Sequence, residues 1–255
     1  MSNLWQGLIG ALGTVLRLFH DAVVGIPVID VAAWGWAIIL LTAAVRLVLL
    51  PLAVKQTRSM RAMQTLQPEI KKLQGKYKTD RTMMKTDPEK YRERKAAQQQ
   101  ETMALYKEHG VNPAAGCLPL VAQMPIFFAL FTLLRSDEYV SELGTASFYF
   151  ASLGDSAIAA GVGGISLIVA MAATTFISQK QMMAHQPAAA VQPQQKMLLY
   201  VMPVMLAFFS FRLPVGVLLY WATTNLWTMA QQYLMFRNVE HSPAPARTAG
   251  ARQSK

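Results

Sequence analysis

The segment from Trp34 to Val54 constrains the fold most, because its 21 residues contain a single charge. A helix of this length is about 31 Å long and matches the hydrocarbon core of a bilayer. The charge, Arg46, lies near the middle, where insertion scales assign arginine a cost of about 2.5–3.5 kcal/mol. Such a residue usually faces a polar cavity shared with other helices, and Thr42 lies one turn earlier on the same face. In the alternative, Arg46 extends its side chain to the membrane surface. Lys55, which follows the end of the apolar span, is about 13 Å away along the helix axis. This distance is far for one side chain to reach, and the sequence therefore favours the cavity.

Composition indicates an integral membrane protein, because hydrophobic residues make up 53% of the chain and charged residues only 15%. Long apolar runs predict an all-α polytopic membrane protein with five transmembrane helices. The predicted spans are residues 33–54, 117–134, 161–180, 197–212 and 213–236.

The fourth span is short, because its apolar run covers only residues 197–211 and would extend about 22 Å as a helix. This length suggests local bilayer thinning or a helix end buried in protein. The run meets the fifth span at Arg212-Leu213-Pro214, which has room only for a tight turn. These two spans are therefore predicted to form a helical hairpin.

The distribution of basic residues predicts the orientation in the membrane. Residues 55–110 contain 14 Lys/Arg against 7 Asp/Glu, and the 237–255 tail has four basic residues against Glu240. Residues 135–160 contain one Arg against four acidic residues. The positive-inside rule then places the 55–116 insertion, the 181–196 linker and the tail in the cytoplasm, with the 135–160 loop outside. Five spans put the N-terminus outside and the C-terminus inside.

Residues 1–32 show apolar side chains at helical spacing between Leu4 and Phe19, with polar residues on the other faces. We expect an extracytoplasmic amphipathic helix at the membrane interface, ended by Gly25 and Pro27. A signal sequence, cleaved or uncleaved, is the alternative. A cleavable signal requires basic residues before its apolar stretch. The first basic residue here, Arg17, lies near the end of that stretch, which argues against this alternative.

The 55–116 insertion is predicted to be a basic helical hairpin. Pro68 should kink or restart the first arm, Asp87 and Pro88 should begin the second, and Gly110 should end it. One view is a solvated, charged helix pair. The functional view is an arm that meets phospholipid headgroups, ribosomal RNA or acidic nascent chains. One apolar stripe on the first arm supports pairing of the arms: Met60, Met63, Leu66, Ile70, Leu73 and Tyr77.

Signs of enzyme chemistry are missing from the sequence. The four histidines are scattered, no phosphate-binding GxxxxGK[ST] motif occurs, and Cys117 is the only cysteine. The five spans contain no acidic residue, which argues against a proton relay. We therefore expect no enzyme activity, no cofactor and no metal site.

Three stretches carry a family resemblance: MRAMQTLQPEIKKLQGKYKTD, LYKEHGVNPAAGCLPLVAQMPIFFALFTLL and LPVGVLLYWATTNLWTMAQQYLMFR. In this order, over about residues 33–238, the chain resembles the YidC/Oxa family of membrane protein insertases. The resemblance implies a five-helix core around a hydrophilic groove that opens to the cytoplasm and to lipid. It implies that Thr42 and Arg46 line this groove, together with Gln123 of LVAQMPIF and Trp221 of LYWATTN. It also implies that the basic hairpin acts early in substrate capture.

The expected function is that of an insertase or chaperone in the bacterial cytoplasmic (inner) membrane. It would take nascent or short hydrophobic proteins into the bilayer without nucleotide hydrolysis. Its expected partners are nascent membrane proteins, the lipid bilayer, the translating ribosome as a transient partner, and the Sec translocon. The alternatives are a small-anion transporter or channel that uses Arg46, and a ribosome or lipid anchor that moves no substrate. Transporters often show internal repeats, and none is visible in this sequence.

Overall fold

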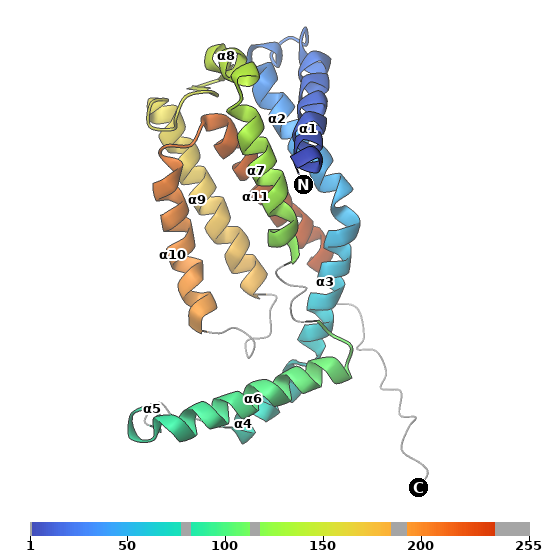
Figure 1. The fold of residues 1–255 in the computed structure, drawn as a ribbon, viewed down its shortest axis with the longest axis vertical. Helices are drawn as coiled ribbons and strands as arrows, with labels where there is room; N and C mark the ends of the chain where they lie inside the picture. The colour runs from blue at the N-terminus through green and yellow to red at the C-terminus, as the bar shows by residue number, and fades with distance from the viewer. Residues whose placement is uncertain (1, 78–82, 113–117, 185–192, 238–255) are drawn as a thin grey trace.

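The computed structural model describes residues 2–77, 83–112, 118–184 and 193–237. Most of these residues are helical, and the long helices form an upright bundle with one helix pair lying across its end (Figure 1). Cys117, half of the predicted linker (residues 185–192) and the tail after residue 237 lie outside the described residues. The elements are α1 (Ser2–Val23), η1 (Asp30–Ala32), α2 (Ala33–Val48), α3 (Leu50–Thr65), α4 (Gln67–Lys76), α5 (Met83–Thr86), α6 (Pro88–Glu108), α7 (Leu118–Leu134), α8 (Asp137–Thr145), β1 (Ser147–Phe148), β2 (Ala151–Ser152), α9 (Gly161–Ala184), α10 (Pro193–Ser210) and α11 (Val215–Arg237).

The five predicted spans correspond to helices α2, α7, α9, α10 and α11. Length and apolar composition alone make two helical stretches of the described chain candidates for crossing a membrane, residues 30–48 and 161–183. The apolar parts of α7 and α10, residues 122–134 and 199–210, are shorter. The number of membrane-crossing helices therefore stays a prediction.

The predicted continuous helix over 33–54 is interrupted at Leu49, where α2 ends and α3 begins. Pro51 causes this break, because it has no backbone N–H to donate and its ring crowds the preceding turn. Arg46 therefore lies in the last turn of α2, not in the middle of an uninterrupted helix. The negative end of the helix dipole favours a cation at this position.

Helix α10 begins at Pro193, earlier than the predicted start at 197, and has 18 residues. The added length weakens the argument for local thinning. A short turn joins α10 to α11 as expected, but the two helices do not pack together as the predicted hairpin would, because α9 packs against both of them. In this turn the Leu213 N–H donates to the Ser210 carbonyl over 3.1 Å.

The 135–160 segment contains α8 and an antiparallel pair of strands, which the sequence did not predict. It packs against the α10–α11 turn, because the Ala157 N–H donates to the Leu213 carbonyl and the Val215 N–H donates to the Asp155 carbonyl, both over 3.0 Å. The backbone of this segment also lies close to Gly164 of α9, because a Cβ atom at that residue would lie 1.9 Å from the Ala157 carbonyl oxygen.

Helix α1 confirms the predicted helical segment and ends just before Gly25, which has a positive φ of 84°. It lies alongside α2 and also packs against α7 (Figure 1). Leu16 is fully buried, and Arg17 pairs with Glu138 over 2.8 Å and with Glu142 over 3.3 Å. The Tyr139 hydroxyl donates to the Gly13 carbonyl over 3.1 Å. Position at a membrane interface stays a prediction for this helix, which is firmly attached to the bundle.

The predicted hairpin arms begin and end as their local chemistry requires. Pro68 lies in the first turn of α4, the Asp87 side chain accepts from the Lys90 N–H over 3.1 Å, and Gly110 follows α6 with a φ of 64°. Helices α4 and α6 pack together across the end of the bundle (Figure 1). A separate small core joins α3, α4 and α6 through Met60, Met63, Leu66, Ile70 and Tyr106.

Polar contacts also join the two arms. The Tyr77 hydroxyl donates to Glu101 over 2.5 Å, and the Lys76 ammonium group pairs with the same carboxylate over 2.9 Å. The hydrogen bond from Tyr77, followed by that from Lys76, lowers the pKa of Glu101 below its ordinary value.

Candidate functional site

Three helices bring one cation and two polar groups together inside the bundle. Tyr220 of α11 is only 3% exposed, and its hydroxyl accepts a hydrogen bond from the Gln123 side-chain amide of α7. Arg46 lies in the last turn of α2, which packs against α11, in the vicinity of Tyr220. Arg46, Gln123 and Tyr220 are called the polar cluster below. Arg46 and Gln123 were expected at one site, and the structure shows Gln123 bonded to Tyr220, with Arg46 in the vicinity.

Arg46 differs from the other basic residues of the bundle in its surroundings. It is partly buried in the last turn of α2, whereas the adjacent Leu47 and Val48 are exposed. Within the described residues, no carboxylate forms an ion pair with Arg46. A half-buried cation without a counter-ion attracts acidic groups more strongly than a solvated surface cation does. Arg46 therefore has the position and charge to pair with an anion from outside the chain.

Thr42 and Trp221 lie beside the cluster but have other contacts. Thr42 is 1% exposed, and its hydroxyl donates to the Ile38 carbonyl of its own helix over 2.7 Å. Trp221 is partly buried and packs edge-on against Phe127 with a ring-centroid distance of 5.1 Å. Both residues contribute to packing in this structure, and their expected role in a groove stays a prediction.

Sequence reasoning missed Tyr220. The spacing of Tyr220 and Thr224 on α11 places them one turn apart and could have indicated a polar face. Which polar residue of α11 belongs to the cluster, however, depends on the neighbouring helix that each one faces. Only the packing of α7 and α2 against α11 reveals that Tyr220 joins Gln123 and Arg46.

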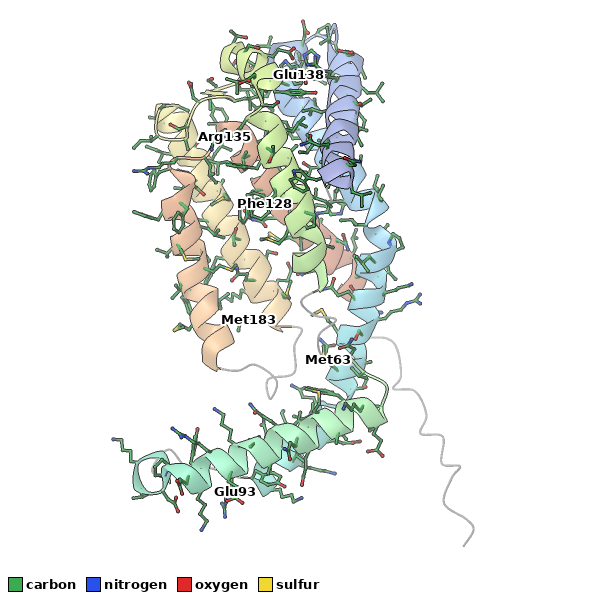
Figure 2. The ribbon with its side chains drawn as sticks, viewed as in Figure 1. Met63, Glu93, Phe128, Arg135, Glu138 and Met183 are labelled. Carbon is green, nitrogen blue, oxygen red and sulfur yellow. The ribbon has the colours of Figure 1, made fainter. Side chains whose placement is uncertain are left out.

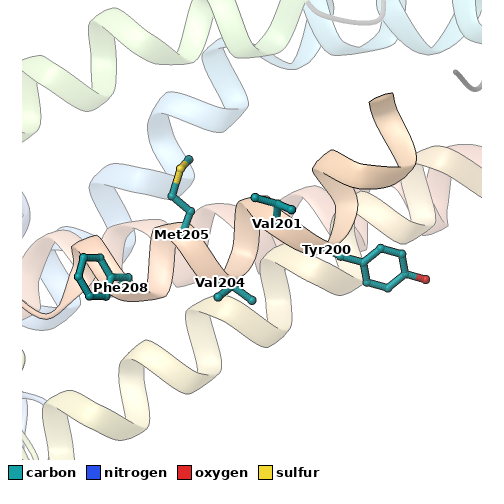
Figure 3. A pocket seen from close by; sticks show the side chains of 5 residues that line it. All are labelled: Tyr200, Val201, Val204, Met205 and Phe208. Carbon is teal, nitrogen blue, oxygen red and sulfur yellow. The ribbon is translucent and has the colours of Figure 1, made fainter. Parts of the chain in front are cut away.

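Two shallow apolar depressions lie outside the polar cluster. One, of about 710 Å³, lies between α1 and α7 and is lined by Trp5, Met124, Pro125, Phe128 and Thr132; Figure 2 labels Phe128. The other, of about 450 Å³, is a face of α10 lined by Tyr200, Val201, Val204, Met205 and Phe208 (Figure 3). Neither includes Arg46, and a continuous hydrophilic groove therefore stays an expectation from the family resemblance.

The charged ends of the bundle are well separated. Figure 2 shows Arg135 and Glu138 toward one end of the bundle and Glu93 of α6 beyond the other. Among the described residues no three His, Cys, Asp or Glu side chains gather in a way that could hold a metal ion. The polar cluster has hydrogen-bonding and ion-pairing groups, and these suit reversible attraction of a charged or polar segment.

Comparisons with known proteins show the family and the fold of this chain. Residues 28–242 match the model of the family described as 60Kd inner membrane protein. The chain is 40% identical to the membrane protein insertase YidC of Streptomyces avermitilis, covering 86% of this chain and 54% of that protein. It is 38% identical to the membrane protein insertase MisCA of Bacillus subtilis, covering 86% of this chain and 77% of that protein.

A solved structure shows the same fold. It is described as an active YidC insertase crystal structure with the first transmembrane domain resolved, and it matches with a TM-score of 0.60 and 29% sequence identity. The match covers 91% of this chain and 46% of that chain. The fold and the family match define a helical membrane protein similar to membrane protein insertases. The chain belongs to the YidC family of 60Kd inner membrane proteins, although it spans only about half the length of some relatives.

Proposed function

We propose that this chain is a membrane protein insertase of the bacterial inner membrane. The observation that carries the proposal is the match over residues 28–242 to a family whose similar members are named membrane protein insertases. The polar cluster adds a physical reason, because it offers a cation and two polar groups to a hydrophilic segment inside an apolar helix bundle.

Arg46 would act by attracting acidic residues of a substrate as they leave the cytoplasm. Groups that hydrogen-bond or pair with the substrate inside the bundle reduce the thickness of hydrocarbon that a hydrophilic segment must cross. With a negative cell interior, outward movement of one negative charge is favourable by about 2.3 kcal/mol per 100 mV. Apolar parts of the substrate would move sideways into lipid, where burial contributes about 25 cal/mol per Å². Nucleotide hydrolysis is unnecessary in this scheme.

The proposed topology places α2, α7, α9, α10 and α11 across the membrane, with the N-terminus outside and the C-terminus in the cytoplasm. The charge asymmetry supports it, because the arms of the basic hairpin and the acidic 135–160 segment lie at opposite ends of the bundle (Figure 1). Helices α4 and α6 would then lie on the cytoplasmic side and meet substrates first. Nascent membrane proteins are the proposed substrates, with the translating ribosome and the Sec translocon as partners.

Reconstitution tests the function directly. Proteoliposomes containing only this protein should insert a short single-span membrane protein, measured as a protease-protected fragment, without added ATP. Empty liposomes and liposomes with an unrelated helical membrane protein serve as controls. Flux of small anions without insertion would instead support a transporter. Binding of ribosomes or anionic lipid with neither activity would support an anchor.

A further inference from the structure

A second polar contact lies on the opposite side of α11 from the polar cluster. The Asn225 side-chain amide donates to the Thr175 hydroxyl of α9 over 2.8 Å and to the Thr174 hydroxyl over 3.3 Å. Asn225 is 9% exposed and Thr175 is 5% exposed. These bonds join two helices that pack closely along their length.

The spacing of Asn225 and Tyr220 explains why this contact matters for the cluster. Five residues correspond to a rotation of about 140° around a helix, since each residue adds about 100°. Asn225 therefore faces α9 when Tyr220 faces Gln123 of α7. Rotation of α11 that turns Tyr220 away from α7 would also separate Asn225 from Thr175.

Other polar side chains on this part of α11 do not provide the same constraint. The Thr223 hydroxyl donates to the Leu219 carbonyl over 2.8 Å, and the Thr228 hydroxyl donates to the Thr224 carbonyl over 2.8 Å. Both bonds lie within α11 and are insensitive to its rotation. Asn225 bonds to a neighbouring helix, and a buried interhelical amide can fix helix register in this way.

We propose that Asn225 is a positioning residue for insertion. It holds α11 in the rotation that places the Tyr220 hydroxyl against the Gln123 side-chain amide, and it acts through the α9 threonines without touching substrate. This inference rests on the proposed function, because it assigns the polar cluster a part in insertion.

The orientation of α11 can be measured separately from insertion. Cysteines replacing Phe127 and Trp221, whose rings are in contact, report the α7–α11 interface by their rate of disulfide formation in a Cys117→Ala background. Asn225→Leu should slow this crosslinking. In the chain without the reporter cysteines it should slow insertion by about three- to twentyfold, the range expected for a lost interhelical hydrogen bond. The matched control is Thr223→Val, which removes a hydroxyl bonded within α11 and should change neither rate.

A double variant that exchanges the amide and the hydroxyl distinguishes loss of the hydrogen bond from misfolding of Asn225→Leu. The double variant Asn225→Thr with Thr175→Asn retains an amide and a hydroxyl at the interface, and it should recover both rates relative to Asn225→Leu. Unchanged crosslinking in Asn225→Leu, or no recovery in the exchanged pair, would overturn the inference. Slower crosslinking with full insertion would uphold the positioning of α11 and remove the polar cluster from the proposed insertion mechanism.

Discussion

Replacing Tyr220 with phenylalanine tests whether the polar cluster takes part in insertion. The change removes the hydroxyl that accepts from Gln123, but it keeps the buried ring. A lost hydrogen bond costs about 0.5–1.5 kcal/mol, and an unpaired buried donor costs about 1–3 kcal/mol. Gln123 is only partly buried, and we therefore expect Tyr220→Phe to destabilise the cluster by a total of about 1–2 kcal/mol. This free energy is equivalent to about a 5–30-fold change in an equilibrium constant.

The assay compares initial insertion rates in proteoliposomes with thermal stability in detergent. Tyr233→Phe is the matched control, because Tyr233 lies on the same helix and is 59% exposed. Tyr220→Phe should insert several-fold more slowly than Tyr233→Phe at equal protein content. Adding Gln123→Leu to Tyr220→Phe should restore stability, because no donor is then left unpaired, but it should not restore insertion. Equal insertion rates for Tyr220→Phe and Tyr233→Phe would refute the proposed role of the cluster.

Three further expectations concern charge, orientation and pH. Arg46→Lys should retain much activity, whereas Arg46→Ala should impair substrates with acidic translocated tails more than neutral ones; equal losses would indicate a structural role. Cysteine at Asp137, in a Cys117→Ala background, should react with an impermeant thiol reagent from outside the cell, and cysteine at Lys85 only after the membrane is opened; the reverse pattern would invert the topology. The lowered pKa of Glu101 means that its contribution to pairing of the hairpin arms is present above its ordinary pKa and is lost as pH falls through the lowered value. Hydrogen-exchange protection factors in α4 and α6, corrected for the intrinsic pH dependence of amide exchange, should therefore fall in acid, and Glu101→Gln should remove this acid-induced loss of protection.

Local chemistry made several helix boundaries predictable from sequence. Asp87 caps α6 with its side chain, Pro68 restarts the first arm, and Gly110 has the left-handed conformation that ends a helix. Each of these effects depends on residues within one turn. The apolar runs similarly located the long helices, because a continuous buried or lipid-facing surface requires them.

Features that depend on distant contacts were not predictable in the same way. The 135–160 segment packs against the α10–α11 turn, and this contact joins residues that are far apart in the sequence. Tyr220 became a site residue through its contact with Gln123, which is far away in the sequence. A single sequence contains the donor and the acceptor but does not specify which residues face each other.

Helix α11 shows why hydropathy alone misjudges this bundle. Its 23 residues are long enough to cross a bilayer, yet it is not among the two described stretches that qualify by length and apolar composition together. The contacts of Tyr220 with α7 and of Asn225 with α9 pair polar groups that would be costly in hydrocarbon. The same side chains that weaken the membrane signal of α11 therefore join it to its neighbours. Because these pairings need α7 and α9 to be in place, stable insertion of α11 should depend on assembly of the bundle, and the polar cluster should form in that final packing step.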